Sequence, residues 1–328
     1  RLAQRGHTVT IVHPQSFSVE EGLKPFFNMI KFSLGRRPRP QWFTVSPEVK
    51  LLRVPDPREK FIPDGDAIIA TAWRSAEWVK AYGLEKGKKF YFIQDYEVWS
   101  GPQEAVDATW RLPLKKVVTS QWLKGLSEKI GEGVAAHIPY GINFEIFRLL
   151  EPIEGRDSRR IGMVYADGEH KGFSDGLKAI EIVKEEYPYI TVIIAGKSAK
   201  IPELPKNTEF HWRLQHKAMA GFYNRCGIFV CSSRAEGWGL PSTEAMACGC
   251  ALVTTDAGGP RDYAFHEETA LLSPPRAPDE LAKNIMRLIR DDALRQSLAK
   301  RGYEYIQRYT WEKAVNEFER VLRETNPP

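Results

Sequence analysis

The sequence predicts an α/β protein built on parallel β-sheets. Short apolar segments with strand character alternate with helix-like segments along nearly the whole chain, which is the pattern of parallel α/β domains. The length of 328 residues favours two such domains. The polar, breaker-rich segment from Glu151 to Arg160 is the best candidate for a linker between them. We therefore expect one domain in residues 1–150, a second in 151–310, and a terminal helix in 311–328.

The expected strands of the first half are short apolar runs bounded by polar or turn-forming residues. They are Thr8–Val12, Lys50–Val54, Ala67–Ala72, Phe90–Ile93 and Lys116–Thr119, followed by a helix over Ser120–Ile130. The chain begins abruptly, because Arg1 to Gly6 resembles the end of a helix with a glycine C-cap. A doubly wound domain starts with a strand before that helix, so we expect that a first strand is missing.

The second half continues the same alternation. Its expected strands are Ile161–Tyr165, Thr191–Ala195, Ile228–Cys231, Ala251–Thr254 and Ala270–Leu272. Its expected helices are Asp175–Glu186, His216–Arg225, Pro241–Ala247, Pro278–Arg290 and Trp311–Arg323. The regular alternation favours a second parallel sheet covered by helices.

Composition excludes several classes of protein. An apolar content of 42% with 27% charged residues is typical of a globular domain, and no apolar run approaches the length of a membrane span. A net charge of +5 without a nucleic-acid-binding motif argues against nucleic acid as a partner. The mild positive charge suits an anionic nucleotide ligand or an anionic membrane surface. The four cysteines lack the paired spacing of a zinc site, so we expect buried, reduced thiols in a cytoplasmic protein.

One run of the second half carries the most chemical information: Arg234-Ala-Glu-Gly-Trp-Gly-Leu-Pro-Ser-Thr-Glu-Ala-Met-Ala-Cys-Gly249. It follows an expected strand, and Pro241 is favoured at the first position of a helix. A loop that ends on a helix N-terminus presents N–H groups and a positive dipole end to a phosphate. Glu236 in the loop and Glu244 in the expected first helical turn can supply acceptors for sugar hydroxyls beside that phosphate site.

The Glu236-x7-Glu244 pattern, the string after Glu244 and the later pair Gly258-Gly259 resemble the donor-binding signature of the retaining family 4 glycosyltransferases. These enzymes, also called glycosyl transferases group 1, have the GT-B fold. The resemblance implies two Rossmann-like domains with parallel sheets facing across a cleft, and a terminal helix that returns to the first domain. It extends over about residues 135–328, with Asn143 replacing a usual Asp.

The resemblance also implies roles for single residues. Glu236 contacts the donor sugar and Glu244 holds the ribose hydroxyls. Lys171, in a Lys-Gly pair with Gly172, reaches the donor diphosphate and stabilises the charge that builds on it. The implied donor-binding set is Arg234, Gly237, Trp238, Gly239, Leu240, Pro241, Glu244, Gly258 and Gly259. A simple turn explains the last two glycines equally well.

The chain departs from the family at a second diphosphate cation. Many relatives carry a Gly-Arg pair after the strand that precedes Lys171, whereas this chain has Tyr165-Ala166-Asp167. The second cation is therefore missing or is supplied by another residue, such as Arg234 or Lys197.

The candidates for binding an acceptor lie in the first half. Gln94 and Asp95 follow one expected strand and Trp73 follows another, at the strand ends where parallel sheets bind ligands. A turn-capping aspartate and core aromatic residues would explain them equally well. Residues 25–39 are apolar and then basic, which is compatible with an acceptor loop or with contact to an anionic lipid surface. A core helix followed by a solvated basic loop is the favoured interpretation of that segment.

Two other motifs compete with this interpretation. Asp64-Gly-Asp66 has the spacing of a metal-binding pair, but it precedes a strand instead of following one, so we expect a turn and no metal. Gly237-x-Gly239-x-x-Ser242, with Asp256 further on, is close to a dinucleotide fingerprint. A five-residue insert between strand and glycines argues against it.

The sequence thus predicts an enzyme that transfers a sugar from a nucleotide-diphospho-sugar to a glycan, lipid-linked or small-molecule acceptor, with retention of configuration and without a metal or other cofactor. Two alternatives remain open: an oxidoreductase of the NAD type, and a non-catalytic binder of sugar nucleotides or glycans. The base, sugar, acceptor and oligomeric state are not determined by the sequence.

Overall fold

The computed structural model describes residues 1–15, 45–131, 133–198 and 203–324. Contacts divide the chain into two compact units. Unit 1 comprises Arg1–Val118, Ser127–Ala136 and Val315–Pro328, and unit 2 comprises Thr119–Leu126 and His137–Ala314. Both units pair their strands in parallel, so the predicted α/β class is confirmed.

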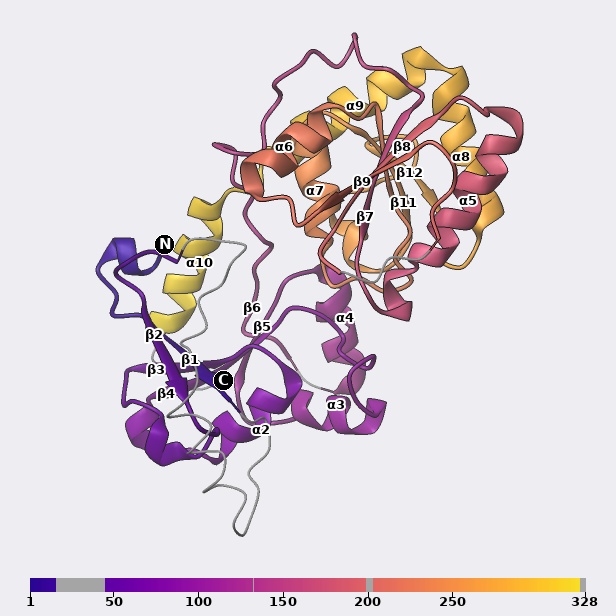
Figure 1. Ribbon diagram of the computed structural model, residues 1–328. Helices are drawn as coiled ribbons and strands as arrows, with labels where there is room; N and C mark the ends of the chain where they lie inside the picture. Colours follow the sequence, from indigo (N-terminus) through magenta and orange to yellow (C-terminus); the bar gives the residue numbers. More distant parts are fainter. Residues whose placement is uncertain (16–44, 132, 199–202, 325–328) are drawn as a thin grey trace. The chain divides into compact units, whose positions relative to one another are not determined.

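Unit 2 is a doubly wound α/β domain around a six-stranded sheet (Figure 1). Its strands are β7 (Arg160–Tyr165), β8 (Thr191–Gly196), β9 (Thr208–Trp212), β10 (Ile228–Cys231), β11 (Ala251–Thr255) and β12 (Ala270–Ser273). Its helices are α5 (Phe173–Glu186), α6 (His216–Asn224), α7 (Leu240–Ala247), α8 (Pro278–Arg290) and α9 (Asp292–Ile306). Helices α5 and α8 lie on one side of the sheet, and α6 and α7 on the other.

The strand order of this sheet is β12-β11-β10-β7-β8-β9. From β7 the chain runs outward through β8 and β9, then crosses to β10 and runs outward the other way. The order therefore reverses between β7 and β10. Ligands of open α/β sheets bind at such a switch point, beyond the carboxyl ends of the strands.

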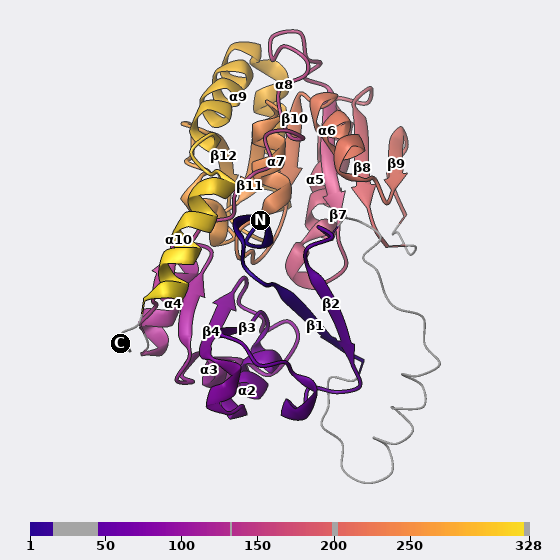
Figure 2. The same cartoon turned by 90° about the vertical axis from the view of Figure 1, so that its left-hand side faces the viewer.

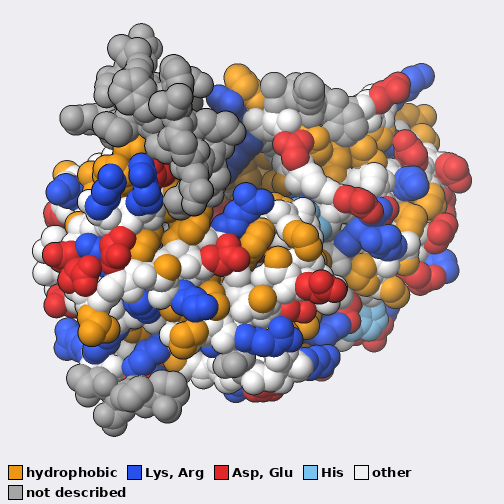
Figure 3. Space-filling view, turned by 90° about the horizontal axis from the view of Figure 1, so that it is seen from below, with side chains coloured by type: hydrophobic (Ala, Val, Ile, Leu, Met, Phe, Trp, Pro, Cys, Tyr) orange, Lys and Arg blue, Asp and Glu red, His pale blue; other side chains and the backbone are white. Residues whose placement is uncertain are grey.

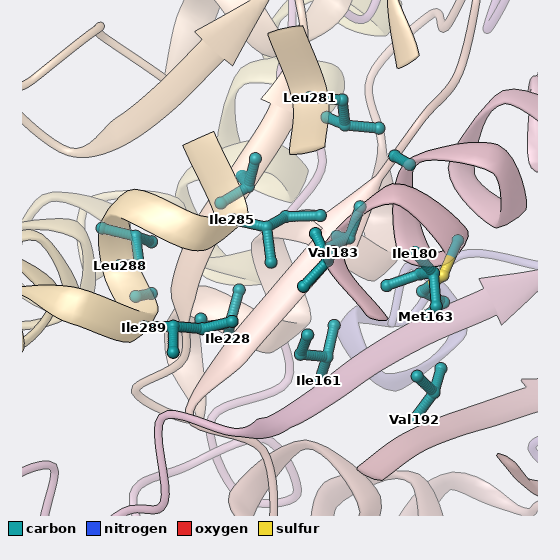
Figure 4. Close-up of a cluster of buried hydrophobic side chains, with 14 of the residues drawn as sticks. Ile161, Met163, Ile180, Val183, Val192, Ile228, Leu281, Ile285, Leu288 and Ile289 are labelled. Carbon is teal, nitrogen blue, oxygen red and sulfur yellow. The ribbon is translucent and has the colours of Figure 1, made fainter. Parts of the chain in front are cut away.

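Side chains of the central strands enter a hydrophobic cluster on each face of the sheet. In β8, Val192 and Ile194 join the cluster under α5 and α8, whereas Ile193 and Ala195 join the cluster under α6 and α7. Figure 4 shows the first of these clusters, in which Ile161 and Ile228 of the strands lie near the helical side chains. Burial on both faces explains why these strands are continuous apolar runs in the sequence.

Unit 1 contains two parallel sheets, which are visible in Figure 2. One pairs β1 (Thr10–Pro14) with β2 (Lys50–Val54). The other has the order β3 (Ala67–Ala70), β4 (Lys88–Ile93), β5 (Lys115–Val118) and β6 (Ala136–His137). Helices α2 (Trp73–Ala81) and α3 (Gln103–Trp110) belong to this unit, and α4 (Gln121–Ile130) has residues in both units. Short 3-10 turns cover Ala3–Arg5, Glu59–Phe61 and Leu84–Lys86.

The terminal helix α10 (Trp311–Arg323) contacts unit 1 from Val315 onward. Phe318 packs on Phe92 of β4 with ring centroids 5.8 Å apart. Glu319 accepts a hydrogen bond of 2.7 Å from Arg5 and lies 2.7 Å from the His7 ring nitrogen. Arg5 and His7 lower the pKa of Glu319 through these bonds. The last turns of α10 are therefore held to unit 1 by an aromatic contact and a charged cluster.

The predicted linker is part of the unit 2 core. Within the segment from Glu151 to Arg160, Ile153 is 3% exposed and Arg156 is 6% exposed. Arg156 donates to the carbonyl oxygens of Cys248 (2.6 Å) and Glu151 (3.0 Å) and to the Asn224 side chain (3.0 Å). The predicted boundary at residue 150 also falls inside unit 2, because Ile142 and Phe147 pack in the cluster under α6 and α7.

Every strand and helix that was predicted with stated bounds is present, and most of their ends agree with the prediction to within two residues. The prediction did not contain β6, β9, α2, α3 or α9. Strand β9 lies at the edge of its sheet and is only partly buried, so its polar sequence lacks the apolar run of an inner strand. The expected strand Ala67–Ala72 ends at Ala70 because α2 begins at Trp73.

Charged side chains of both signs are interspersed over the face shown in Figure 3. Within the described residues, no helix combines the length and the apolar character that a membrane span requires. The apolar and basic segment 25–39, considered above as a lipid-binding surface, lies outside the described residues.

Candidate functional site

Lys171 lies at the switch point of the unit 2 sheet. It ends a 3-10 turn (Glu169–Lys171) that follows β7, and Gly172 then leads into α5. Gly172 has a φ of +59°, and a Cβ there would clash with the carbonyl oxygen of Ser232 in the loop after β10. A glycine is therefore required at this position, because the two loops approach each other closely.

Glu236 lies in the loop after β10 and is held there by its backbone. Its N–H donates to the carbonyl of Ala257 (2.9 Å), and its carbonyl accepts from the N–H of Gly259 (2.8 Å). Its carboxylate accepts from Lys171 Nζ at 3.0 and 3.1 Å and from the hydroxyl of Ser233 at 3.1 Å. The fold thus joins the lysine after β7 to the glutamate after β10.

Gly258 and Gly259 follow β11 and begin a 3-10 turn (Gly259–Asp262). A Cβ on Gly259 would clash with the backbone of Gly237, which is buried in the loop after β10. Gly258 has a φ of +101°, and a Cβ there would clash with the indole of Trp122. Contacts within the protein therefore require both glycines, and their approach to a ligand stays a prediction.

Helix α7 begins one residue earlier than predicted. Gly239 caps it in the left-handed conformation (φ +99°), Leu240 is the first helical residue and Pro241 follows. The N–H groups of Ser242 and Thr243 donate to the carbonyl of Gly239 at 3.1 and 3.2 Å. Because Pro241 has no N–H, this helix start offers fewer free donors to a phosphate than the prediction assumed.

Glu244 lies in the second turn of α7, not in the first turn as predicted, because the helix starts at Leu240. Its Oε2 accepts a hydrogen bond of 3.0 Å from the hydroxyl of Tyr223 in α6. Burial raises the pKa of Glu244 to about 7, although the Tyr223 hydrogen bond and the charge of Lys197 oppose that rise. The prediction did not include Tyr223, because nothing in the sequence places α6 beside α7.

Arg234 is bound by two carboxylates of its own chain. It donates to Asp175 at 2.8 and 2.9 Å and to Glu169 at 2.6 Å. The hydrogen bonds from Arg234 lower the pKa of Asp175. Arg234 therefore ties the start of α5 to the loop after β10, and its contact with a diphosphate stays a prediction.

The two large side chains of the loop differ in burial. Trp238 is 1% exposed and packs against Tyr263 and Tyr309, with ring centroids 5.3 and 5.1 Å away. Contact between Trp238 and a donor would therefore involve its backbone. Leu240 is 41% exposed.

The three acceptor-side candidates lie at strand ends of unit 1. Gln94 donates to the carbonyl of Thr71 (3.1 Å), and Asp95 accepts from the N–H of Tyr96 (2.9 Å). Trp73 is 8% exposed, and its indole N–H donates to the hydroxyl of Ser100 (2.9 Å). The side chain of Trp73 is therefore structural, whereas Gln94 and Asp95 are half-buried and stay predictions.

The competing motifs are occupied by ion pairs. Asp64 is exposed and accepts a hydrogen bond of 2.6 Å from the mostly buried side chain of Lys86. Asp256, which a dinucleotide site would use for a ribose, is paired with Arg261 at 2.5 and 3.0 Å. The four cysteines are free thiols, of which Cys231 is the one that is only partly buried.

Comparison with known proteins identifies this part of the chain. Residues 152–305 match the family model of the glycosyl transferases group 1. These residues therefore belong to the group 1 glycosyltransferases. Their family segment contains Lys171, Glu236 and Glu244, so the resemblance inferred from these residues is confirmed at the level of the family.

Among curated relatives of the group 1 glycosyltransferase segment, an uncharacterized glycosyltransferase of Methanocaldococcus jannaschii is 32% identical over 106 residues. That match covers 32% of this chain and 30% of the relative. D-inositol 3-phosphate glycosyltransferase of Jonesia denitrificans is 31% identical over 164 residues, which cover 46% of this chain and 39% of the relative. The chain thus matches well under half the length of these relatives.

Solved structures extend the likeness beyond the group 1 glycosyltransferase segment. Sucrose-phosphate synthase of Thermosynechococcus elongatus gives a TM-score of 0.73 at 18% identity, covering 98% of this chain and 90% of its own. Anabaena Alr3699/HepE in complex with UDP and glucose gives a TM-score of 0.69 at 15% identity. That match covers 96% of this chain and 99% of the Anabaena chain. At such identities the likeness shows the fold, and the predicted GT-B fold is confirmed.

Proposed function

We propose that this chain transfers a sugar from a nucleotide-diphospho-sugar to an acceptor with retention of anomeric configuration. The observation that supports this most is the pairing of Lys171 with Glu236 at the switch point of the unit 2 sheet. A cation and a hydroxyl acceptor are the two groups that a diphospho-sugar needs at its reacting bond. The family of residues 152–305 agrees with this chemistry.

In this proposal Lys171, Glu236 and Glu244 each bind a different part of the donor. Lys171 stabilises the diphosphate, on which negative charge builds as the glycosidic bond breaks. Glu236 orients the sugar through its hydroxyls, and Glu244 binds the ribose hydroxyls. Ser233, which donates to Glu236, limits the orientations of that carboxylate. Because Arg234 is paired with Asp175 and Glu169, Lys171 provides most of the positive charge that stabilises the diphosphate.

A uridine donor is the first to test. Solved structures of this fold include Anabaena Alr3699/HepE with UDP-glucose and the pneumococcal O-GlcNAc transferase GtfA with UDP and GlcNAc. The proposal requires no metal or other cofactor. Within the described residues no cluster of His, Cys, Asp and Glu has the geometry of a metal site.

The acceptor in this proposal is a glycan, a lipid-linked sugar or a small molecule, with Gln94 and Asp95 as candidate contacts. A lipid acceptor draws support from a relative named phosphatidyl-myo-inositol mannosyltransferase in Mycobacterium tuberculosis, which is 22% identical over 201 residues. A peripheral membrane contact through residues 25–39 and a cytoplasmic location belong to the same proposal.

Calorimetric titration of UDP-, GDP- and ADP-glucose, with NAD as the competing ligand, tests the proposed donor. We expect saturable binding of one nucleotide sugar and slow hydrolysis of that donor without acceptor. NMR of the product's anomeric proton then tests retention. Binding of NAD alone would favour the oxidoreductase, and binding without hydrolysis or transfer would favour the non-catalytic binder.

A further inference from the structure

Tyr223 makes a buried hydrogen bond to the side chain of Glu244. It lies in α6 with 0% exposure, and its ring packs edge-on against Phe147, Phe222 and Phe229. Its hydroxyl donates to Oε2 of Glu244 in α7 at 3.0 Å. A tyrosine so enclosed has little freedom to move, so its hydroxyl is a fixed donor.

Tyr223 also contacts the chain just beyond α7. Its carbonyl oxygen accepts a hydrogen bond of 3.1 Å from the thiol of Cys250, and Cys250 in turn donates its N–H to the carbonyl of Ala245 (3.0 Å). The hydroxyl and the carbonyl of one residue therefore bind both the middle of α7 and the turn after it. This double attachment sets the position of α7, and with it the position of Glu244, relative to α6.

We propose that Tyr223 is a positioning residue that holds the Glu244 carboxylate for the ribose hydroxyls of the donor nucleotide. This inference rests on the proposed function, in which Glu244 binds the ribose. A hydroxyl that donates to a carboxylate forms a strong, short-range bond and favours the ionised form. The ionised carboxylate accepts hydrogen bonds on both oxygens, whereas the protonated acid uses one oxygen as a donor.

The groups around Glu244 make its ionisation sensitive to this one bond. Burial raises the pKa of Glu244 to about 7, and the opposing influences are Tyr223 from α6 and Lys197 after β8. Cys248, at the end of α7, stays a neutral thiol because burial raises its pKa. Loss of the Tyr223 hydroxyl would raise the pKa of Glu244 further, so a smaller fraction of the carboxylate would be ionised at neutral pH.

The test measures nucleotide affinity against pH in four proteins: wild type, Tyr223→Phe, Glu244→Gln and Tyr82→Phe. The ligand is the tightest binder among UDP-, GDP- and ADP-glucose, whose diphosphates do not titrate near pH 7. Tyr82→Phe is the matched control, because this buried tyrosine donates its hydroxyl to the carbonyl of Pro57 in unit 1. Each variant keeps the packing of the ring or side chain that it replaces.

In the wild type we expect affinity to rise with pH through about 7 and then level off, as Glu244 ionises. In Tyr223→Phe the rise moves to higher pH, so that binding is about tenfold weaker at pH 7 and only a smaller part of this loss, due to the lost positioning, remains at pH 9. Glu244→Gln binds weakly without this pH dependence. For the 2′,3′-dideoxy analogue of the nucleotide sugar, wild type and Tyr223→Phe bind alike.

Three results would overturn the inference. A wild-type pH profile in Tyr223→Phe would show that the hydroxyl does not act on Glu244. Weakening that affects the dideoxy analogue equally would show a merely structural role. If the wild type binds none of the three nucleotide sugars, the proposed function fails and this inference fails with it. Binding by the wild type with no change in Tyr223→Phe refutes the role of Tyr223 alone.

Discussion

The ammonium nitrogen of Lys171 lies 3.0 and 3.1 Å from the two carboxylate oxygens of Glu236, although 65 positions separate the two residues in the sequence. Both side chains are mostly shielded from solvent, with 25% and 15% exposure. The pair therefore holds a cation and an acceptor together before any ligand binds. Preorganised charge of this kind costs no rearrangement during the reaction.

Lys171→Ala should lower turnover more than it weakens donor binding. The donor diphosphate is charged already in the ground state, but further charge builds only in the transition state. We expect a loss of about 100-fold or more in kcat, the scale for removing one preorganised stabilising group. Steady-state kinetics with saturating acceptor measures it.

Lys178→Ala is the control for this variant, because Lys178 is an exposed lysine of α5, the helix that follows Lys171. It should leave both constants unchanged. An increase in KM with no change in kcat would show that Lys171 contributes only to donor binding. No effect on either constant would show that another cation stabilises the diphosphate.

Glu236→Gln and Glu244→Gln should have different kinetic effects. Glu236 faces the reacting sugar in our proposal, so its amide variant should mainly lower kcat. Glu244 faces the ribose, so its variant should mainly weaken nucleotide binding. Each loses a hydrogen bond to a charged group, which corresponds to about 1.5–3 kcal/mol.

Calorimetry and initial rates on the two glutamine variants separate these effects. Glu304→Gln is the control, because it makes the same chemical change at an exposed position of helix α9. It should leave both nucleotide affinity and kcat unchanged. Wild-type constants in both site variants would remove the central claim of the proposed function.

Activity should persist after removal of divalent metal. The proposal assigns the diphosphate to Lys171, so no step requires a metal ion. The measurement is a transfer assay in excess EDTA, with added Mg²⁺ or Mn²⁺ as the comparison. Complete loss that either ion restores would contradict the assignment of Lys171.

Arg156→Met should destabilise unit 2. The buried guanidinium donates to the carbonyls of Cys248 and Glu151 and to Asn224, so its removal leaves buried acceptors without a donor. We expect a loss of about 3 kcal/mol or more in the free energy of unfolding. Urea denaturation followed by fluorescence measures it.

Arg159→Met serves as the comparison for stability, because Arg159 is exposed on the same segment. It should change the unfolding midpoint little. Equal effects of the two substitutions would show that the contacts of Arg156 do not stabilise the unit.

Much of the fold follows from local patterns. Strands such as β2 and β10 and helices such as α8 and α10 have the predicted ends, because apolar runs and helical periodicity are properties of short segments. The loop that carries Glu236 was recognised in the same way. Strand β9 was missed because an edge strand does not need an apolar run on both faces.

Polarity alone does not predict the partners of two arginines. The segment from Glu151 to Arg160 looks like a linker, yet Arg156 is buried, and its hydrogen bonds are accepted by two distant parts of the chain, around Asn224 and at Cys248. The ion pairs of Arg234 with Asp175 and Glu169 were not predicted either, and its contact with a donor stays a prediction. In both cases the partner lies far away in the sequence.

The sequence by itself determined the α/β class, the positions of most helices and strands, and the residue types on which the proposed function rests. Only the tertiary structure decided which of these residues meet. Lys171 reaches Glu236 because β7 lies beside β10, and Tyr223 reaches Glu244 because α6 packs beside α7. Strand order and helix packing depend on burying apolar faces from distant segments together, and no local pattern encodes that choice.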